Sequence, residues 1–298
     1  MAKDLDTSLS ELEHLTGLSL RLEGLNGENE AEAQKKVAML VSAYRDKYDR
    51  TNFIRRMLTG EIGGNDLYLW AAHFHIADKV RREVYVVDVD SSDTETVLTI
   101  LKQMFVTNGG DVVASVDGHK TVLIKVLTAR ESRESIDKRA KVLVDTLNTE
   151  AMVKARVGLG HPTESVGELQ EAYQEACTCL AIGSIFYHGQ TLFTYDKLGI
   201  GRLIYRLPND VCKSFLHEVC KDFDITTLDD ESVSIINAFF ENNLNISETA
   251  RHLYVHRNTL VYRFEKLKAL TGVDLRNFDE AMELKVAMMV ADYLKTKE

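Results

Sequence analysis

The spacing of apolar positions divides the chain into a helical beginning, an alternating middle and a helical end. Between Asn29 and Gly60 apolar residues recur every three or four positions, which is the period of a helix with one buried side. About thirty residues is long for a globular helix. We therefore expect a break near Asp49 or a dimer-forming connector, with a helix packed on its own domain as the alternative. The mixed pattern before Asn29 predicts a short helix and then a turn, with or without a short strand, and residues 61–80 predict a further short helix.

Between residues 81 and 200, valine-rich runs alternate with amphipathic segments. Strands are predicted at 83–90, 111–116, 120–126, 151–160 and 190–196, with helices after the first, third and fourth. The second and third strands form a predicted hairpin, because Asp117-Gly118 suits the positive φ angles of a tight turn. This order of elements predicts a layered α/β sheet with its helices on one side.

Past Gly201 no strand is predicted, and helical periodicity continues to the end. Pro208 marks a boundary, because proline cannot continue a helix. The predicted fold class is α+β and multi-domain. Its parts are a helical connector region over 1–80, an α/β domain over 81–207 and an all-helical domain over 208–298.

The most informative stretch lies in the last domain. Asn245 and, three residues on, Glu248 form a capping-box signature, and a short helix follows to Leu253. Tyr254-Val255 makes a turn, and a second helix runs from about Arg257 to Leu270, before Gly272. The residues expected to face one shared core are Ala250, Leu253, Val255, Leu260, Phe264 and Leu267. A short helix, a tight turn and a longer helix are typical of a helix-turn-helix.

The outward side of the second helix has residues suited to nucleic acid. Arg257 and Asn258 lie in its first turn, from which arginine can bond guanine and asparagine can bond adenine. Residues 243–276 contain six basic and three acidic side chains, a net charge of +3. Basic residues attract phosphates. These features favour double-stranded DNA as the partner over a helical hairpin with an ordinary charged face.

The stretch SETARHLYVHRNTLVYRFEKLKALTG resembles the C-terminal helix-turn-helix of the PucR/CdaR family of bacterial transcription regulators, with LYVHRNTLVYR as its most specific part. The resemblance covers about residues 230–298. The DNA-binding residues expected from it and from the helix pattern are His256, Arg257, Asn258, Thr259, Tyr262, Arg263 and Lys266. Among these, Thr259 and Arg263 are expected on phosphates, while Arg257 and Asn258 contact bases. The family has a basic residue where this chain has Val261.

Members of that family commonly have an upstream domain resembling the GGDEF fold of diguanylate cyclases, and residues 81–200 match its order of elements. Asp88 and Asp90 lie where cyclases hold metal. However, the hairpin turn lacks the paired glycines and acidic pair that such catalysis needs, and Gly109-Gly110-Asp111 precedes its strand. Gly158-Leu159-Gly160 lacks the third glycine of a nucleotide motif. We expect no enzyme and no catalytic residue; a nucleotide-binding or nucleotide-cyclising enzyme with an accessory DNA module is the alternative.

Composition changes this picture little. The 298 residues have a net charge of −10, so the chain outside 243–276 has −13, which opposes non-specific DNA association. No apolar run could span a membrane, and no signal peptide is present, so we expect a cytoplasmic protein with four reduced, buried cysteines. His73-Phe-His75 could place two imidazoles on one side of a strand. Since no third ligand is evident, no metal and no cofactor are expected.

Together these features predict a sequence-specific transcription regulator that acts as a homodimer. It is expected to control a metabolite-responsive catabolic or transport operon, with a small-molecule effector that the sequence does not identify. The body of the protein would then sense a signal or dimerise. The alternative is an architectural protein whose helix-turn-helix serves as a scaffold.

Overall fold

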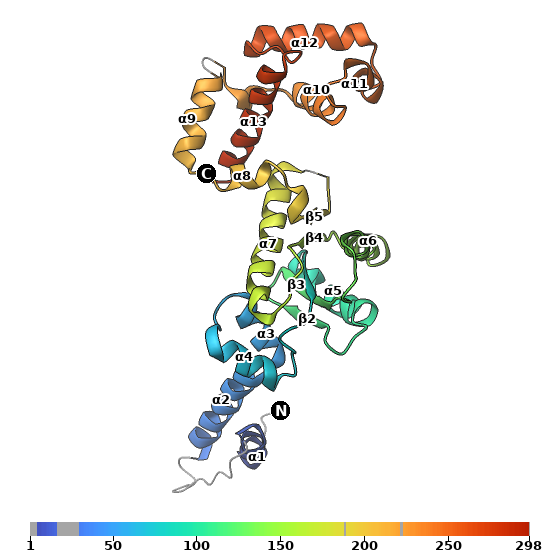
Figure 1. Cartoon of the computed structure of the whole chain (residues 1–298). Helices are drawn as coiled ribbons and strands as arrows, with labels where there is room; N and C mark the ends of the chain where they lie inside the picture. Colours follow the sequence, from blue (N-terminus) through green and yellow to red (C-terminus); the bar gives the residue numbers. More distant parts are fainter. Residues whose placement is uncertain (1–4, 17–29, 188, 221–222, 298) are drawn as a thin grey trace. The chain divides into compact units, whose positions relative to one another are not determined.

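The computed structural model describes residues 5–16, 30–187, 189–220 and 223–297 (Figure 1). The chain forms two compact units, of which the first comprises Met1–Leu180 with Gln190–Tyr195 and the second Ala181–Gly189 with Asp196–Glu298. The first unit has a sheet and the second is helical, so the mixed fold class is confirmed. No helix in the described ranges combines the length and the apolar character that a bilayer crossing requires.

The described residues before the sheet form the helices α1 (Leu5–Thr16), α2 (Glu30–Tyr48), α3 (Arg50–Leu58) and α4 (Gly64–His73). The break near Asp49 is confirmed. The Asp49 carboxylate accepts hydrogen bonds from the backbone amides of Thr51 and Asn52, both at 3.2 Å, and so starts a new helix. The turn or strand expected just before Asn29 lies outside the described residues.

Among the described residues, five strands form one sheet in the order β2-β3-β1-β4-β5. They are β1 (Arg82–Asp88), β2 (Val112–Ser115), β3 (Lys120–Val126), β4 (Arg156–Leu159) and β5 (Leu192–Thr194). All neighbours are antiparallel except β4 and β5, which are parallel. The central strand β1 is buried over its first six residues, which include the charged Arg82 and Glu83 as well as the apolar run over 84–87.

Helices cover both faces of this sheet, so the prediction of helices on one side was wrong. One face packs its apolar side chains, including those of Tyr85 and Val157, against α5 (Thr94–Ile100) and α6 (Arg133–Asp145). On the other face lies α7 (Leu169–Phe186) (Figure 1). At Gly158 of β4 a β-carbon would lie 2.2 Å from the carbonyl oxygen of Ala176 in α7, so glycine is needed for the close approach.

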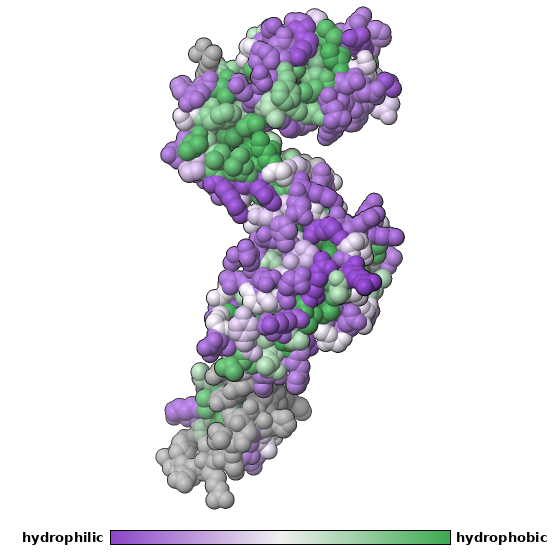
Figure 2. Space-filling model, viewed as in Figure 1, coloured by the Kyte–Doolittle hydropathy of each residue, from purple (hydrophilic) through white to green (hydrophobic). Residues whose placement is uncertain are grey.

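The predicted hairpin of β2 and β3 is confirmed, but its turn differs. The amide of Val116 donates to the carbonyl of Lys120 at 3.0 Å, which leaves a three-residue loop over 117–119. Neither Asp117 nor Gly118 has a positive φ. Hydrophilic residues cover most of the visible surface around the sheet (Figure 2).

After Gly201 every described regular element is a helix, as the sequence predicts, apart from one short 3-10 turn over Ile225–Thr227. The helices are α8 (Gly201–Tyr205), α9 (Asn209–Cys220), α10 (Asp230–Glu241), α11 (Ile246–His252), α12 (Arg257–Thr271) and α13 (Phe278–Lys295). Two apolar clusters hold the second unit together. The larger joins α10, α11, α12 and α13, and the smaller joins α8, α9 and α13 with the end of α7. The division into three domains at residues 80 and 207 stays a prediction.

Candidate nucleic-acid interface

The two helices of the predicted helix-turn-helix begin at defined caps. The Asn245 side chain accepts hydrogen bonds from the amides of Ser247 and Glu248, which starts α11. The Glu248 carboxylate does not complete the capping box, because it pairs with Arg251 instead. At the start of α12, Nδ1 of His256 accepts from the amide of Asn258 at 3.2 Å. His256, which we expected on DNA, therefore caps the helix in this structure.

The core of the motif is the one that the sequence predicts. Ala250, Leu260, Phe264 and Leu267 are all at most 3% exposed. Leu253 and Val255 pack against them as partly buried residues of the same cluster. The Phe264 ring meets that of Phe239 from α10 edge to face, with 4.8 Å between centroids. This packing fixes the angle at which α12 presents its outer side.

The outer side of α12 presents polar side chains to solvent. At about 3.6 residues per turn, Asn258, Tyr262 and Lys266 fall opposite the buried stripe. All three are exposed, Tyr262 by 70%. Arg257 and Thr259 are exposed on the two flanks of that side. Apart from the capping residue His256, five of the seven expected contact residues are thus exposed on α12, and we call them the α12 face. Asn258, Thr259, Tyr262 and Lys266 lie within about 100° of one another around the helix, and Arg257 lies outside that arc in the first turn.

Ion pairs distinguish the basic residues of this motif. Arg263 donates to Glu231 of α10 at 2.7 Å, and its side chain is only 30% exposed. Arg251 pairs with Glu248. Within the part of the chain that the structure describes, Arg257 and Lys266 form no ion pair, although Lys266 lies near enough to Asp229 to help lower the pKa of that carboxyl. The net charge of +3 read from the sequence therefore overstates the number of cations available to a phosphate.

A cluster of charges fixes the loop from α12 to α13. The Asp274 carboxylate accepts from Arg276 at 2.8 Å and from Lys268 at 3.0 Å, and Arg276 also pairs with Glu265 at 2.7 Å. The guanidinium of Arg276, together with Lys268, holds the pKa of Asp274 well below its usual range. Lys268 and Arg276 therefore stabilise the fold of the motif and are not free to bind DNA.

In the sheet domain, the residues that suggested cyclase chemistry have structural partners. Asp88 pairs with Arg156 of the neighbouring strand at 2.6 Å. Asp117 accepts from the amides of His119 and Lys120 at 2.8 and 2.6 Å, and from the Lys120 ammonium at 3.1 Å. Since both carboxylates are engaged by cations or amides, the hairpin end of the sheet lacks the open acidic pair that a catalytic metal needs.

Asp111 of Gly109-Gly110-Asp111 forms a buried anchor. It accepts from the Lys125 ammonium at 2.6 Å, and its other oxygen accepts from the amide of Val126 at 2.9 Å. Burial by itself would raise the pKa of Asp111, but the bonds from Lys125 and the backbone lower it below its ordinary value. The motif thus ties the loop before β2 to β3. Asp90 precedes a 3-10 turn without a capping bond from its side chain.

The metal and thiol expectations have mixed outcomes. His73 ends helix α4 and His75 follows with a φ of 56°, so these residues do not form a strand. No set of three or more potential ligands occurs among the described residues. The cysteines are free thiols, with Cys179 and Cys212 buried and Cys177 and Cys220 partly exposed. Burial raises the pKa of the Cys177 thiol.

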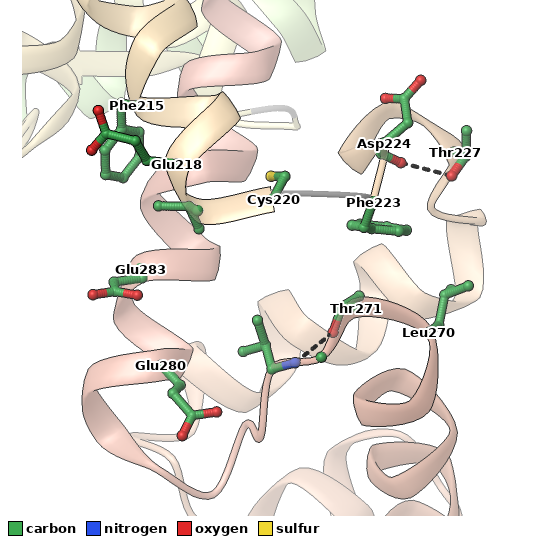
Figure 3. Close-up of a pocket in the computed structure, with 13 residues that line it drawn as sticks. Phe215, Glu218, Cys220, Phe223, Asp224, Thr227, Leu270, Thr271, Glu280 and Glu283 are labelled. Atoms are coloured by element: carbon green, nitrogen blue, oxygen red, sulfur yellow. Dashed lines mark hydrogen bonds between the residues drawn. The ribbon is translucent and has the colours of Figure 1, made fainter.

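A pocket of about 950 Å³ lies in the helical unit beside the end of α12 (Figure 3). Phe215, Phe223 and Leu270 supply apolar lining, and carboxylates from α13 and the loop before α10 lie at its edge. Two of these carboxylates already bond within the chain: Glu280 accepts from the amide of Asp274 at 2.7 Å, and Asp224 accepts from that of Thr226 at 2.9 Å. The pocket by itself therefore does not point to a class of ligand.

Two features of the interface depend on the tertiary structure. Glu231, which binds Arg263, belongs to another helix, and no sequence signal links the two positions. Tyr254 adopts a φ of 55° in the turn and is 97% exposed. The sequence predicts the turn, but it does not predict that the Tyr254 side chain is almost fully exposed.

Comparison with known proteins supports the assignment of α11 and α12 to a helix-turn-helix. The model of the PucR C-terminal helix-turn-helix domain matches residues 233–290, and that of a GGDEF-like domain matches residues 59–182. The carbohydrate diacid regulator of Escherichia coli (strain K12) is 26% identical over 257 residues, which cover 83% of this chain and 66% of that protein.

Two regulators of Bacillus subtilis (strain 168) are also similar. The purine catabolism regulatory protein is 28% identical over 132 residues, 44% of this chain and 25% of its own length. The proline-responsive transcriptional activator PutR is 23% identical over 191 residues, 60% of this chain and 46% of its own length. The chain thus spans between a quarter and two thirds of these relatives. Their names are those of regulators, which agrees with the expectation that the chain is not an enzyme.

Proposed function

We propose that this chain, which belongs to the PucR/CdaR family, is a sequence-specific transcription regulator that binds double-stranded DNA through the α12 face. The observation that supports this most directly is the state of Arg257 and Lys266. Both are exposed on α12, and neither forms an ion pair among the described residues. An unpaired cation is available to phosphate or guanine at no cost in broken ion pairs.

Within this proposal the contact residues have different tasks. Arg257 and Asn258 contact base edges from the first turn of α12, while Thr259, Tyr262 and Lys266 hold the phosphate backbone. Arg263 reaches a phosphate only after leaving Glu231, which lies 2.7 Å away. His256 acts through the cap that it provides, because that cap orients the amides and side chains of the first turn.

We also propose that the active form is a homodimer. A single α12 face offers few base contacts, and one such module gives limited affinity and specificity. Two copies would bind half-sites about one helical turn apart. The proposal also includes a cytoplasmic location. It further includes the division of the chain into three domains at residues 80 and 207.

The regulated genes belong, in this proposal, to a catabolic or transport operon that responds to a metabolite. Relatives are named for carbohydrate diacids, purines and proline, which supports a small organic effector without identifying it. The genes whose upstream DNA the purified protein binds would identify the operon.

Selection from a random DNA library with the full-length protein tests the function. We expect an enriched motif with two half-sites about 10 base pairs apart, and Arg257→Ala should cost about 1–3 kcal/mol on it while relaxing one base position. A library that stays random would exclude sequence-specific binding. If both proteins bind the enriched duplex equally, Arg257 does not contact a base.

A further inference from the structure

Tyr254 combines a left-handed backbone conformation with an almost fully exposed side chain. Its φ of 55° lies in the left-handed region, where glycine is favoured because other residues have a β-carbon that clashes. Its side chain is 97% exposed, so packing does not compensate for this conformation. A tyrosine in place of glycine at the end of α11 therefore weakens the turn without strengthening the core.

The neighbouring residues already supply what the turn needs. Leu253 and Val255 pack into the core of the motif on either side of Tyr254. The backbone amide of Tyr254 donates to the carbonyl of Arg251 at 3.1 Å, a bond that any residue except proline can make. The phenol hydroxyl has no partner within the described ranges of the chain. The ring and its hydroxyl are thus available to a molecule outside this chain.

The position of the turn indicates which molecule that is. Tyr254 lies three residues before Arg257, so at most about 11 Å of chain separates their α-carbons. The first turn of α12 is the part that enters the major groove, which is about 12 Å wide and flanked by phosphates. A residue at this distance from that turn lies within reach of the edge of the groove, where a neutral hydroxyl can donate to a phosphate oxygen.

We propose that Tyr254 is a DNA-positioning residue, with its hydroxyl bonded to a backbone phosphate and its ring lying along the adjacent sugar. This inference rests on the proposed DNA-binding function and adds a contact that precedes α12. Because tyrosine is uncharged, its removal weakens binding to every sequence without changing the salt dependence.

The experiment measures DNA affinity and thermal unfolding of full-length Tyr254→Gly and Tyr254→Phe, using the duplex that the wild type enriches from a random library. We expect Tyr254→Gly to bind about tenfold more weakly, with an unchanged slope of log affinity against log salt. Its Tm should equal or exceed that of the wild type, because glycine suits the left-handed turn. Tyr254→Phe, which keeps the ring and loses the hydroxyl, should account for most of the loss.

Met152→Gly is the matched control. Met152 has the same φ of 55° and is 88% exposed, but it lies in the sheet-containing unit. The substitution should have the same small effect on Tm and leave DNA affinity unchanged. If replacing any non-glycine residue of positive φ by glycine changed DNA affinity, the change would appear equally in both variants.

Three results would overturn the inference. Wild-type affinity in Tyr254→Gly would mean that the side chain does not touch DNA, and a Tm lowered by several degrees would assign it a structural role. A shift from dimer to monomer in sedimentation would place it against a second copy instead. If Arg257→Ala weakens binding while Tyr254→Gly does not, only this inference fails; if the wild type binds no DNA, the proposed function fails as well.

Discussion

Replacement of Glu231 by glutamine tests whether Arg263 contacts DNA or holds α10 to α12. The two side chains pair at 2.7 Å, and Glu231 is 60% exposed whereas Arg263 is 30% exposed. If Arg263 binds a phosphate in the complex, the wild type must first break this pair. Glu231→Gln removes that cost and leaves the arginine in place, so we expect DNA affinity to rise.

The size of the rise follows from the exposure of the pair. Exposed ion pairs contribute about 0–1 kcal/mol, since water and salt screen them. Freeing Arg263 is therefore worth at most about 1 kcal/mol in each protomer, or about fivefold in affinity. Two half-sites would double the free energy, to at most about 2 kcal/mol for a dimer.

The assay is a fluorescence anisotropy titration of a duplex with full-length protein at several salt concentrations. Loss of any carboxylate near DNA also reduces repulsion, so Glu248→Gln serves as the matched control, because Glu248 pairs with Arg251, which is not an expected contact. We expect Glu231→Gln to exceed this control. Unchanged affinity together with a lowered Tm would refute the reasoning and make Arg263 a structural residue that pins α12 to α10.

Three further predictions concern the same unit. Lys266→Ala should reduce the slope of log affinity against log salt by about 0.9 for each protomer in anisotropy titrations, whereas Arg276→Ala, which removes an already paired cation, should not. Phe264→Ala should lower the free energy of unfolding by about 3–5 kcal/mol in urea titrations and weaken binding to all DNA sequences equally, because a 1%-exposed ring is lost from the core. The interactions that lower the pKa of Asp274 stabilise the fold at neutral pH, and this contribution should be lost progressively as the pH falls below about 4. Asp274→Asn should therefore be less stable than the wild type at pH 7 and approach it in acid. Profiles of Tm against pH that run parallel for the two proteins would contradict the assignment.

Local sequence signals were sufficient for most elements of the fold. The break near Asp49 was predictable because an aspartate can cap a helix through bonds to the amides that follow it. The bounds of α12 were predictable because Leu260, Phe264 and Leu267 mark its buried side and Gly272 adopts the left-handed conformation that ends it. These features depend on residues a few positions apart.

The sheet shows where such signals stop. Strand positions were predicted from apolar runs, but an apolar run does not reveal how many faces are covered. The need for glycine at Gly158 arises from the backbone of α7, which begins about ten residues later and returns against the other face. The hairpin turn was placed correctly, while its conformation depended on the Asp117 side chain accepting from the amides of His119 in the loop and Lys120 at the start of β3.

The sequence by itself determined the helix-turn-helix, the core that holds it and the list of side chains with the right chemistry for DNA. Periodicity and capping are local properties, so they can be predicted without knowledge of the fold. Only the tertiary structure decided which of those side chains are available. Glu231 lies 32 positions before Arg263 and becomes its partner only because α10 packs on α12. Charge balance in a sequence counts residues, whereas binding depends on cations that the fold leaves unpaired, and here Arg257 and Lys266 are such cations among the described residues of the motif.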